Sequence, residues 1–374
     1  MEASKTFDFA DVLTRMAEER ASDVHLSPGF APAMRVRGKI TPLEEYGPLS
    51  TQQTRDTVYS LLNDDQRKRF ESAKQLDFAY AVPGVARFRV NTFFQRGSIS
   101  AAFRRIPVEI PQLDELGLPA VLEDFTRKPR GFILVTGPTG SGKTTSLAAM
   151  LDVINREREE HILTIEDPIE FLHNHKSCLV NQREIGADAE DFSLALKSAL
   201  REDPDVILVG EMRDLETMAT ALTAAETGHL VFATLHTQST AQTIDRIIDV
   251  FPAGQQAQVR MQLSIGLQGI VTQQLLPTAD GAGRVVACEV LVPTPAIRNL
   301  IREGKTHQIY SAIQTSGALG MQTMDAHLAQ LVRMGRITRQ LADQRASVPE
   351  ELKRLLGPVA NAEADPAMAM SNGG

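Results

Sequence analysis

The sequence predicts an α/β protein with two domains, the second of which is built on a parallel, doubly wound sheet. Near-continuous apolar runs, typical of parallel strands buried on both faces, occur as GFILVTG, HILTIED, DVILVGE and HLVFATL. Segments with apolar residues at helical spacing lie between them, such as DFSLALKSALRED and LETMATALTAAETG. Strands and helices that alternate in this way favour a parallel sheet with helices on both faces.

The N-terminal part of the chain predicts a smaller α/β domain, which we assign to residues 1–105. Residues 9–21 have the apolar spacing of a helix, and residues 51–72 are typical of one or two surface helices. Residues 33–43 and 86–106 instead alternate apolar and polar side chains, as half-buried strands do.

A proline-rich stretch separates this domain from the rest and predicts a linker at residues 106–118. The second domain is expected to cover residues 119–356 and to be mainly helical beyond residue 290. The last residues, 357–374, are small, polar and interrupted by proline and glycine, so they predict a disordered tail.

Composition excludes several classes of protein. The chain has 39 basic and 47 acidic residues, a net charge of −8, which disfavours a protein that wraps nucleic acid. Its two cysteines, Cys178 and Cys288, exclude a disulfide framework or a four-cysteine zinc site. The N-terminus does not resemble a secretory signal, and no apolar segment is long enough to span a bilayer. We therefore expect a protein that works in the cytoplasm, including at a membrane surface.

A phosphate-binding loop is the most specific motif in the chain. GPTGSGKTT fits the pattern G-x-x-x-x-G-K-[ST] and stands between a predicted strand and a predicted helix, as the motif requires. Its glycines let backbone N–H groups surround phosphate oxygens at a helix N-terminus. Lys143 is expected to reach the β and γ phosphates, and the Thr144 hydroxyl to ligate Mg²⁺. The predicted nucleotide-binding residues are Gly137, Pro138, Thr139, Gly140, Ser141, Gly142, Lys143, Thr144 and Thr145.

The carboxylates expected beside such a loop are arranged unusually. Where many P-loop enzymes place a magnesium-organising aspartate at the end of a strand, this chain has Gly210, followed by Glu211. Glu211 can still approach the metal through a water molecule, and Glu166 and Asp167 end a second buried strand. Carboxylates at the carboxyl ends of parallel strands face the same crevice as the loop. The alternative role for Glu166, Asp167 and Glu211 is helix capping or solvation in a loop. This alternative is stronger for Glu170, so we leave Glu170 out of the site.

Two histidines bracket the strand LVFATL. His229 stands at its entry and His236 at its exit, so they are some 20 Å apart along an extended strand, which disfavours a shared zinc ion. His236 is better placed than His229 to sense a phosphate. The alternative for each is a structural histidine with satisfied hydrogen bonds.

Four sequence blocks in a fixed order resemble a known family. GPTGSGKTT, ILTIEDPIEF, ILVGEMRD and AETGHLVFATLHT resemble the Walker A, Asp box, Walker B and His box of the secretion-type hexameric ATPases, which drive type II secretion and type IV pili. The resemblance covers residues 5 to 350 and is closest to the pilus-retraction branch. AIRNLIR is similar to an element specific to that branch, and the chain lacks cysteines for the four-cysteine zinc module common in the secretion and assembly branches.

The resemblance implies a PAS-like N-terminal domain joined to a RecA-like P-loop ATPase domain, assembled as a homohexamer. It implies that Glu166 is the general base and that Glu211 is an atypical Walker B carboxylate that supports the metal. It implies that His229 and His236 monitor the nucleotide, and that N-terminal arginines complete a neighbour's site. The candidate arginines are Arg87, Arg89, Arg96, Arg104 and Arg105.

The function implied is Mg²⁺-dependent ATP hydrolysis by a hexameric motor that powers type IV pilus retraction and twitching motility. The expected partners are copies of the chain, the inner-membrane pilus platform protein and an accessory retraction ATPase, without nucleic acid. The expected location is cytoplasmic, peripheral to the inner membrane at the pilus base. Two alternatives stay open: a catalytically weak regulator within a mixed ring, suggested by Gly210, and a nucleic-acid motor, disfavoured by the acidic composition.

Overall fold

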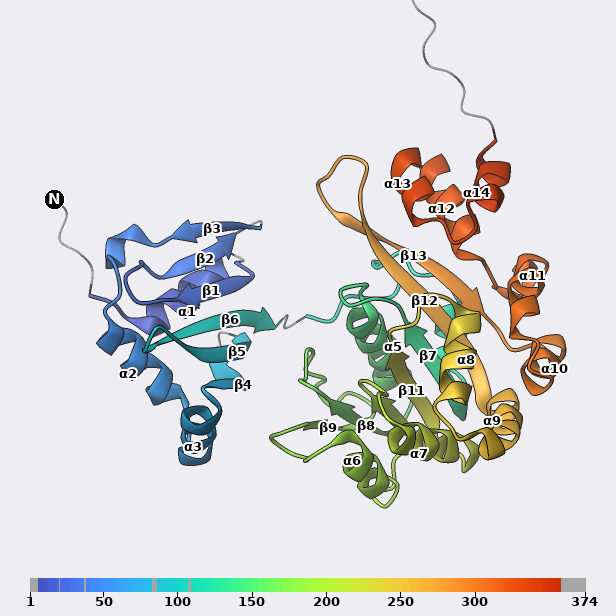
Figure 1. Cartoon of the computed structure of the whole chain (residues 1–374), viewed down its shortest axis with the longest axis horizontal. Helices are drawn as coiled ribbons and strands as arrows, with labels where there is room; N and C mark the ends of the chain where they lie inside the picture. The colour runs from blue at the N-terminus through green and yellow to red at the C-terminus, as the bar shows by residue number, and fades with distance from the viewer. Residues whose placement is uncertain (1–5, 20, 37, 83–85, 107–108, 358–374) are drawn as a thin grey trace, which may run out of the picture. The chain divides into compact units, whose positions relative to one another are not determined.

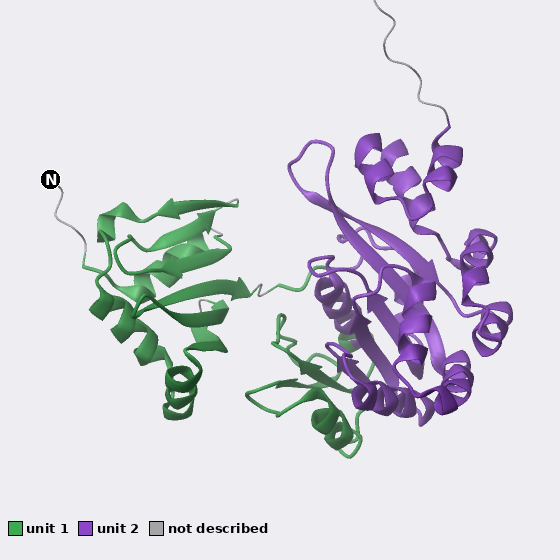
Figure 2. Cartoon of the chain, in the orientation of Figure 1, with its two compact units in different colours: residues 1–111, 155–204 green, residues 112–154, 205–374 purple. Residues whose placement is uncertain are grey.

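The computed structural model describes residues 6–19, 21–36, 38–82, 86–106 and 109–357. The chain forms the mixed α/β structure that the sequence predicts, with strands and helices along most of its length (Figure 1). It divides into two compact units, drawn in green and purple in Figure 2: residues 1–111 with 155–204, and residues 112–154 with 205–374. The domain limits expected at 105 and 119 stay predictions. The tail expected at 357–374 lies outside the described residues, except for residue 357.

The first unit contains a six-stranded sheet with strand order β3-β2-β1-β6-β5-β4. All neighbouring strands in it are antiparallel. The strands are β1 (Asp23–Leu26), β2 (Ala33–Val36), β3 (Lys39–Pro42), β4 (Gln75–Val82), β5 (Ala86–Gln95) and β6 (Ser98–Ile106). The helical segments of this part are α1 (Phe9–Glu18), η1 (Glu44–Tyr46), α2 (Thr51–Leu61) and α3 (Asp64–Ala73). The strands and helices expected in residues 9–106 are therefore present.

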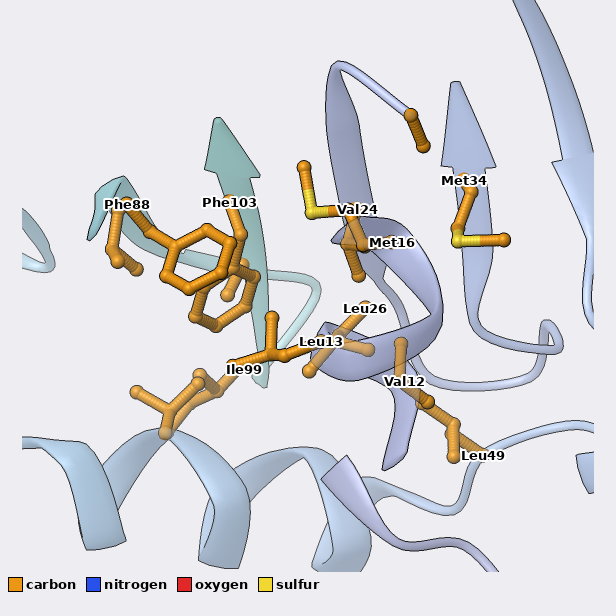
Figure 3. Close-up of a cluster of buried hydrophobic side chains, with 14 of the residues drawn as sticks. Val12, Leu13, Met16, Val24, Leu26, Met34, Leu49, Phe88, Ile99 and Phe103 are labelled. Atoms are coloured by element: carbon orange, nitrogen blue, oxygen red, sulfur yellow. The ribbon is translucent and has the colours of Figure 1, made fainter. Parts of the chain in front are cut away.

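The core of this sheet explains the position of α1. Val12, Leu13 and Met16 share one face of the helix and are almost completely buried, in the same hydrophobic cluster as Phe88 and Phe103 of the sheet (Figure 3). Burial of a side chain of this size stabilises a fold by about 1.5–3 kcal/mol. The helix begins where the Asp8 side chain accepts a hydrogen bond from the Ala10 N–H at 2.9 Å.

The first unit also contains β8 (His161–Glu166), β9 (Leu179–Glu184) and α6 (Phe192–Ala199). The strands β8 and β9 are parallel, and Glu166 stands opposite Glu184 in their register. All of β8 after His161 is buried, as expected for the run HILTIED. Glu166 is thereby the last residue of a buried strand.

The second unit contains five strands in the order β13-β12-β7-β11-β10. β12, β7, β11 and β10 are parallel, and β13 pairs with β12 in the antiparallel direction. The bounds are β7 (Gly131–Thr136), β10 (Val206–Val209), β11 (Leu230–Leu235), β12 (Leu267–Pro277) and β13 (Arg284–Leu291). Every residue of β7, β10 and β11 is buried, which confirms the prediction of parallel strands covered on both faces.

Helices cover these strands. α7 packs against β7 and β11, α8 against β12 and β13, and α12 against β13. The helices are α4 (Val121–Thr126), α5 (Lys143–Glu157), α7 (Leu215–Glu226), α8 (Thr240–Asp249), α9 (Ala253–Gly266), α10 (Pro295–Arg302), η2 (Thr306–Gln308), α11 (Ile309–Gln314), η3 (Gly317–Leu319), α12 (Met324–Arg333), α13 (Arg339–Arg345) and α14 (Pro349–Leu356). The described chain after β13 is mainly helical, as expected.

The AIRNLIR segment forms α10, with Pro295 in its first turn as predicted. The side chain of Thr294 caps the helix by accepting a hydrogen bond from the Ile297 N–H at 3.3 Å. Ile297 and Ile301 are fully buried, and α10 packs against α9. The apolar face of this helix therefore contributes to the core of the second unit.

Candidate active site

The phosphate-loop sequence runs from the end of β7 into the first turn of α5. Gly137, Gly140 and Gly142 have φ values of 136°, 78° and 89°, a region that favours glycine. At Gly137 a Cβ atom would also lie 2.3 Å from the backbone oxygen of Gln273 and 2.8 Å from Ser141 Oγ. Any larger side chain would therefore collide with β12, the strand that contains Gln273, so only glycine fits at this position. This is the strand, loop and helix context that the motif requires.

Lys143 is the first residue of α5 and lies over the loop. Its Nζ atom donates hydrogen bonds to the carbonyl oxygens of Gly137 at 2.8 Å and Pro138 at 3.1 Å. These contacts hold the ammonium group beside the backbone N–H groups at the N-terminus of α5, where the helix dipole also favours an anion. Positive charge and N–H donors therefore converge at the loop.

The donor set of the loop fits a magnesium nucleotide. Thr144, next in α5, is half-buried, and its hydroxyl is a ligand type that Mg²⁺ accepts. The buried Oγ atom of Ser141 has no hydrogen-bond partner among the described residues, so the loop retains a polar group for a ligand. Among the described residues no group of three or more His, Cys, Asp or Glu side chains could hold a metal ion. A metal here would depend on Thr144 and on phosphate oxygens.

Glu211 lies at the same edge of the second unit as the loop, because β10 and β7 run parallel and both end there. Its Oε1 atom is 2.7 Å from Arg213 Nε and 3.1 Å from His236 Nε2, and its Oε2 atom accepts from Arg213 at 2.7 Å. The hydrogen bonds from Arg213 lower the pKa of Glu211 against the opposing effect of burial, and the charges of Arg213 and His236 add smaller effects that also lower it. The side chain is therefore an anion at neutral pH.

The two predicted histidines are at opposite ends of β11. His236 follows the strand at the edge that holds the loop, whereas His229 precedes Leu230, which pairs with Gly131 at the start of β7. The Nδ1 atom of His229 is 2.9 Å from the carbonyl oxygen of Ala224 at the end of α7, so this nitrogen carries the proton. The second unit thus brings His236, but not His229, to the loop and Glu211. The predicted role of His229 stays a prediction.

Glu166 is the last residue of β8 and belongs to the first unit. Its side chain is 6% exposed and accepts hydrogen bonds from Thr164 Oγ1 at 2.7 Å and Gln182 Nε2 at 3.0 Å. Burial, with a smaller effect from the charge of Glu170, raises the pKa of Glu166 to about 7, against the hydrogen bonds from Thr164 and Gln182. A carboxylate with a pKa near the working pH is suited to accept a proton. Asp167 follows it and is joined to Pro168 by a cis peptide bond.

Four of the five candidate arginines contact a residue of the first unit, while Arg96 occupies the turn between β5 and β6. Arg87 donates to Glu184 at 3.1 Å, and Arg104 to Asp23 at 2.9 Å. The other contacts are Arg89 with Asp77 at 3.9 Å and Arg105 with the Ala17 carbonyl oxygen at 3.4 Å, and Arg96 has a φ of 47°. Their predicted action on a neighbouring subunit stays a prediction.

Sequence reasoning missed residues that support the site from neighbouring strands. Thr164 and Gln182 hold Glu166, and Thr234 of β11 donates to the carbonyl oxygen of Gly210. Alternation along the strands was the available signal, because residues two apart, such as Thr164 and Glu166 or Thr234 and His236, lie on one side.

The family model described as "Type II/IV secretion system protein" matches residues 6–282. The chain is 55% identical to "Type IV pilus retractation ATPase PilT" of Pseudomonas aeruginosa, over 92% of this chain and 99% of the relative. It is 52% identical to a "Twitching motility protein" of Neisseria gonorrhoeae, over 86% of each chain. The crystal structure of the pilus retraction motor PilT with bound ADP matches with a TM-score of 0.88 and 50% identity, over 93% of this chain and 99% of that chain.

Among the described residues no helix is long and apolar enough to cross a membrane.

Proposed function

The chain belongs to the type II/IV secretion system protein family, and on this premise we propose how its residues power pilus retraction. It is a nucleotide-binding ATPase of type IV pilus retraction and twitching motility. The observation that carries this assignment is the similarity to PilT, which extends over nearly the full length of both chains. The family model, which matches residues 6–282, includes the phosphate loop.

The phosphate loop binds ATP through its own backbone and side chains. N–H groups of residues 137–145 surround the phosphates, and Lys143 exchanges its contacts with the Gly137 and Pro138 carbonyls for phosphate oxygens. Thr144 would hold Mg²⁺, supported by Glu211, and the ion would supply positive charge that offsets the charge developing on the phosphates.

Glu166 is the general base. It accepts the proton of the water that attacks the γ-phosphate, and its raised pKa matches it to proton transfer near neutral pH. Lys143 stabilises the charge that develops on the transferred phosphoryl group. His236 keeps Glu211 in place, and His229 reports the nucleotide state by a route that involves the end of α7.

Six copies of the chain form the motor. In each copy a PAS-like domain of residues 1–105 is joined by a linker at 106–118 to a RecA-like domain of residues 119–356. Arginines from the set Arg87, Arg89, Arg96, Arg104 and Arg105 complete the site of a neighbouring copy. ATP hydrolysis changes the angle between the two domains, so the ring deforms and does mechanical work on the pilus.

The motor works at the cytoplasmic face of the inner membrane, at the pilus base. Its partners there are the pilus platform protein and an accessory retraction ATPase, and nucleic acid is not among them. The acidic composition, with 39 basic and 47 acidic residues, supports leaving nucleic acid out, as does the lack of a basic, aromatic-rich stretch in the sequence.

Deletion of the gene tests the proposal directly, with a twitching assay and a count of surface pili. Loss of motility together with excess pili is the expected result, because extension continues without retraction. Loss of pili would instead assign the chain to assembly. The second candidate function is a catalytically weak regulator, suggested by Gly210. An ATPase assay on the purified protein tests it, because the absence of measurable ATP hydrolysis would favour the regulator over the motor.

A further inference from the structure

Thr234 holds the backbone on both sides of Glu211. Its hydroxyl donates a hydrogen bond to the carbonyl oxygen of Gly210 at 2.5 Å, and its own carbonyl oxygen accepts from the Met212 N–H at 3.2 Å. Thr234 is only 5% exposed, so water has little access to the hydroxyl. Glu211 is the single residue between these two attachment points.

The need for such an attachment comes from Gly210. β10 ends at Val209, so Gly210 lies just beyond the strand, and it has no side chain that could pack or bond. Glycine also loses more conformational freedom on folding than any other residue. The side chain of Thr234 therefore supplies a constraint on this turn that residue 210 cannot supply itself.

The position of Thr234 connects this constraint to the phosphate loop. β11 pairs with β10 on one side and with β7 on the other, and Thr234 stands opposite Val135 of β7, two residues before Gly137. His236, two residues further along the chain, contacts the Glu211 carboxylate itself. Thr234 and His236, at the end of β11, thus hold the backbone beside Glu211 and its carboxylate, respectively. Because β11 is paired with β7, these contacts fix Glu211 relative to the strand that leads into the phosphate loop.

We infer that Thr234 is a positioning residue for Glu211, and that its hydroxyl presents the Glu211 carboxylate to the magnesium nucleotide. The inference rests on the proposed role of Glu211. In this role Thr234 acts on the backbone beside Glu211 and not on the nucleotide. Thr234 acts by holding the Gly210 carbonyl. Loss of its hydroxyl should therefore change only those properties of the protein that depend on Glu211.

The test compares two substitutions of Thr234 in the purified full-length protein. Thr234→Val keeps the branched shape that suits a strand and removes the hydroxyl, whereas Thr234→Ser keeps the hydroxyl. The matched control is Thr92→Val, because Thr92 is fully buried on β5 and donates to the carbonyl oxygen of Leu76, its partner on β4, at 3.3 Å. Thermal unfolding and gel filtration identify any variant that does not fold or assemble.

Two quantities are measured for each variant: kcat for ATP hydrolysis, and ADP affinity with Mg²⁺ and with EDTA. Thr234→Val is expected to lower kcat roughly tenfold and to reduce the gain in affinity from Mg²⁺, with ADP affinity in EDTA unchanged. Thr234→Ser and Thr92→Val are expected to stay within about twofold of the wild type. Wild-type kcat in Thr234→Val, or an equal loss of ADP affinity with and without Mg²⁺, would overturn the inference.

A double-mutant cycle with Glu211→Gln separates positioning from general structural damage. If Thr234 acts through Glu211, the double variant has the kcat of Glu211→Gln alone, whereas independent effects would multiply and contradict the inference. Failure of the proposed function has a different signature. Wild-type protein without turnover contradicts that function, and the Mg²⁺-dependent gain in ADP affinity still tests Thr234. If the wild type hydrolyses ATP and Glu211→Gln has the same kcat, Glu211 has no role in turnover, and the positioning role of Thr234 is excluded with it.

Discussion

The Nε2 atom of His236 lies 3.1 Å from the Oε1 atom of Glu211, in the second unit at the edge where the phosphate loop begins. The contact joins the end of β11 to the residue that follows the glycine after β10. It is one reason that the pKa of Glu211 is lowered, after the larger effect of the hydrogen bonds from Arg213. A carboxylate that many P-loop enzymes place one residue earlier is thus held here by a neighbouring strand.

Removal of His236 is expected to impair turnover more than folding. His236→Ala deletes one contact of Glu211, so kcat for ATP hydrolysis should fall about fivefold, with little change in Tm. His229→Ala should behave differently, because it removes the hydrogen bond to the Ala224 carbonyl at the end of α7 and should lower Tm by a few degrees. Steady-state kinetics and thermal unfolding of both variants check this. Equal Tm losses in the two variants would contradict the assigned positions.

Glu166→Gln should abolish most turnover while nucleotide binding persists. The amide has nearly the same shape as the carboxyl group and cannot accept the proton, so kcat should fall by about 100-fold or more. The wild-type rate should rise as pH increases through about 7, because the raised pKa leaves Glu166 protonated below that value. A pH series of kcat, with fluorescent-ADP binding as the companion measurement, tests both statements. Wild-type-like hydrolysis by Glu166→Gln would remove this residue from the mechanism.

The Glu166 carboxyl group should also make the free energy of unfolding depend on pH, in the direction opposite to that expected for kcat. The pKa of Glu166 is raised from 4.5 to about 7 in the folded protein, so the folded state binds more protons than the unfolded state between these values. The free energy of unfolding should therefore decrease as pH rises through this window. Thermal unfolding at several pH values should show a weaker dependence for Glu166→Gln than for the wild type. An identical dependence would mean that the carboxyl group is not buried in solution.

Lys143→Ala should remove both tight nucleotide binding and turnover. The substitution deletes the only side-chain cation that the phosphate-loop motif contains, and kcat should fall by about 100-fold or more. Lys305→Ala is the control, because Lys305 is exposed and paired with Glu303 at 2.6 Å, away from the loop sequence. Binding of fluorescent ADP and an ATPase assay compare the two. Retained hydrolysis in Lys143→Ala would exclude the loop as the catalytic phosphate site.

Gly137→Ala should disrupt the loop for a steric reason. The added Cβ would lie 2.3 Å from the backbone oxygen of Gln273, so β7 or β12 must shift, at about 1–3 kcal/mol of stability. Gly254→Ala is the matched control, because a Cβ at Gly254 in α9 meets no atom of the described chain within 4 Å. The variant pair is compared by Tm and by ADP affinity. Unchanged ADP affinity in Gly137→Ala would contradict the close packing of the loop on β12.

The local parts of the site were predictable from the sequence because their signals are contiguous. The phosphate loop, the helix that begins at Lys143 and the strand that ends at Glu166 each follow from the pattern of a few neighbouring residues. The helix with Pro295 in its first turn is another example. Backbone geometry and burial act over one or two turns, so a short window contains the necessary information.

The supporting contacts could not be predicted in the same way. Thr234 meets Gly210 from 24 residues away, and Gln182 meets Glu166 from 16 residues away. Gly137 is required as glycine because of Gln273, which is on a strand far along the chain. Such pairs depend on strand order and register, and neither is visible in one sequence.

The sequence by itself determined the nucleotide loop, the alternation of buried strands and helices, and the residues that end those strands. Only the tertiary structure decided which of them act together. It brought the His236 side chain to the Glu211 carboxylate, and it buried Glu166 deeply enough to raise its pKa to about 7. The physical reason is that local propensity sets the elements, whereas desolvation and hydrogen bonds between distant residues exist only once the strands have paired.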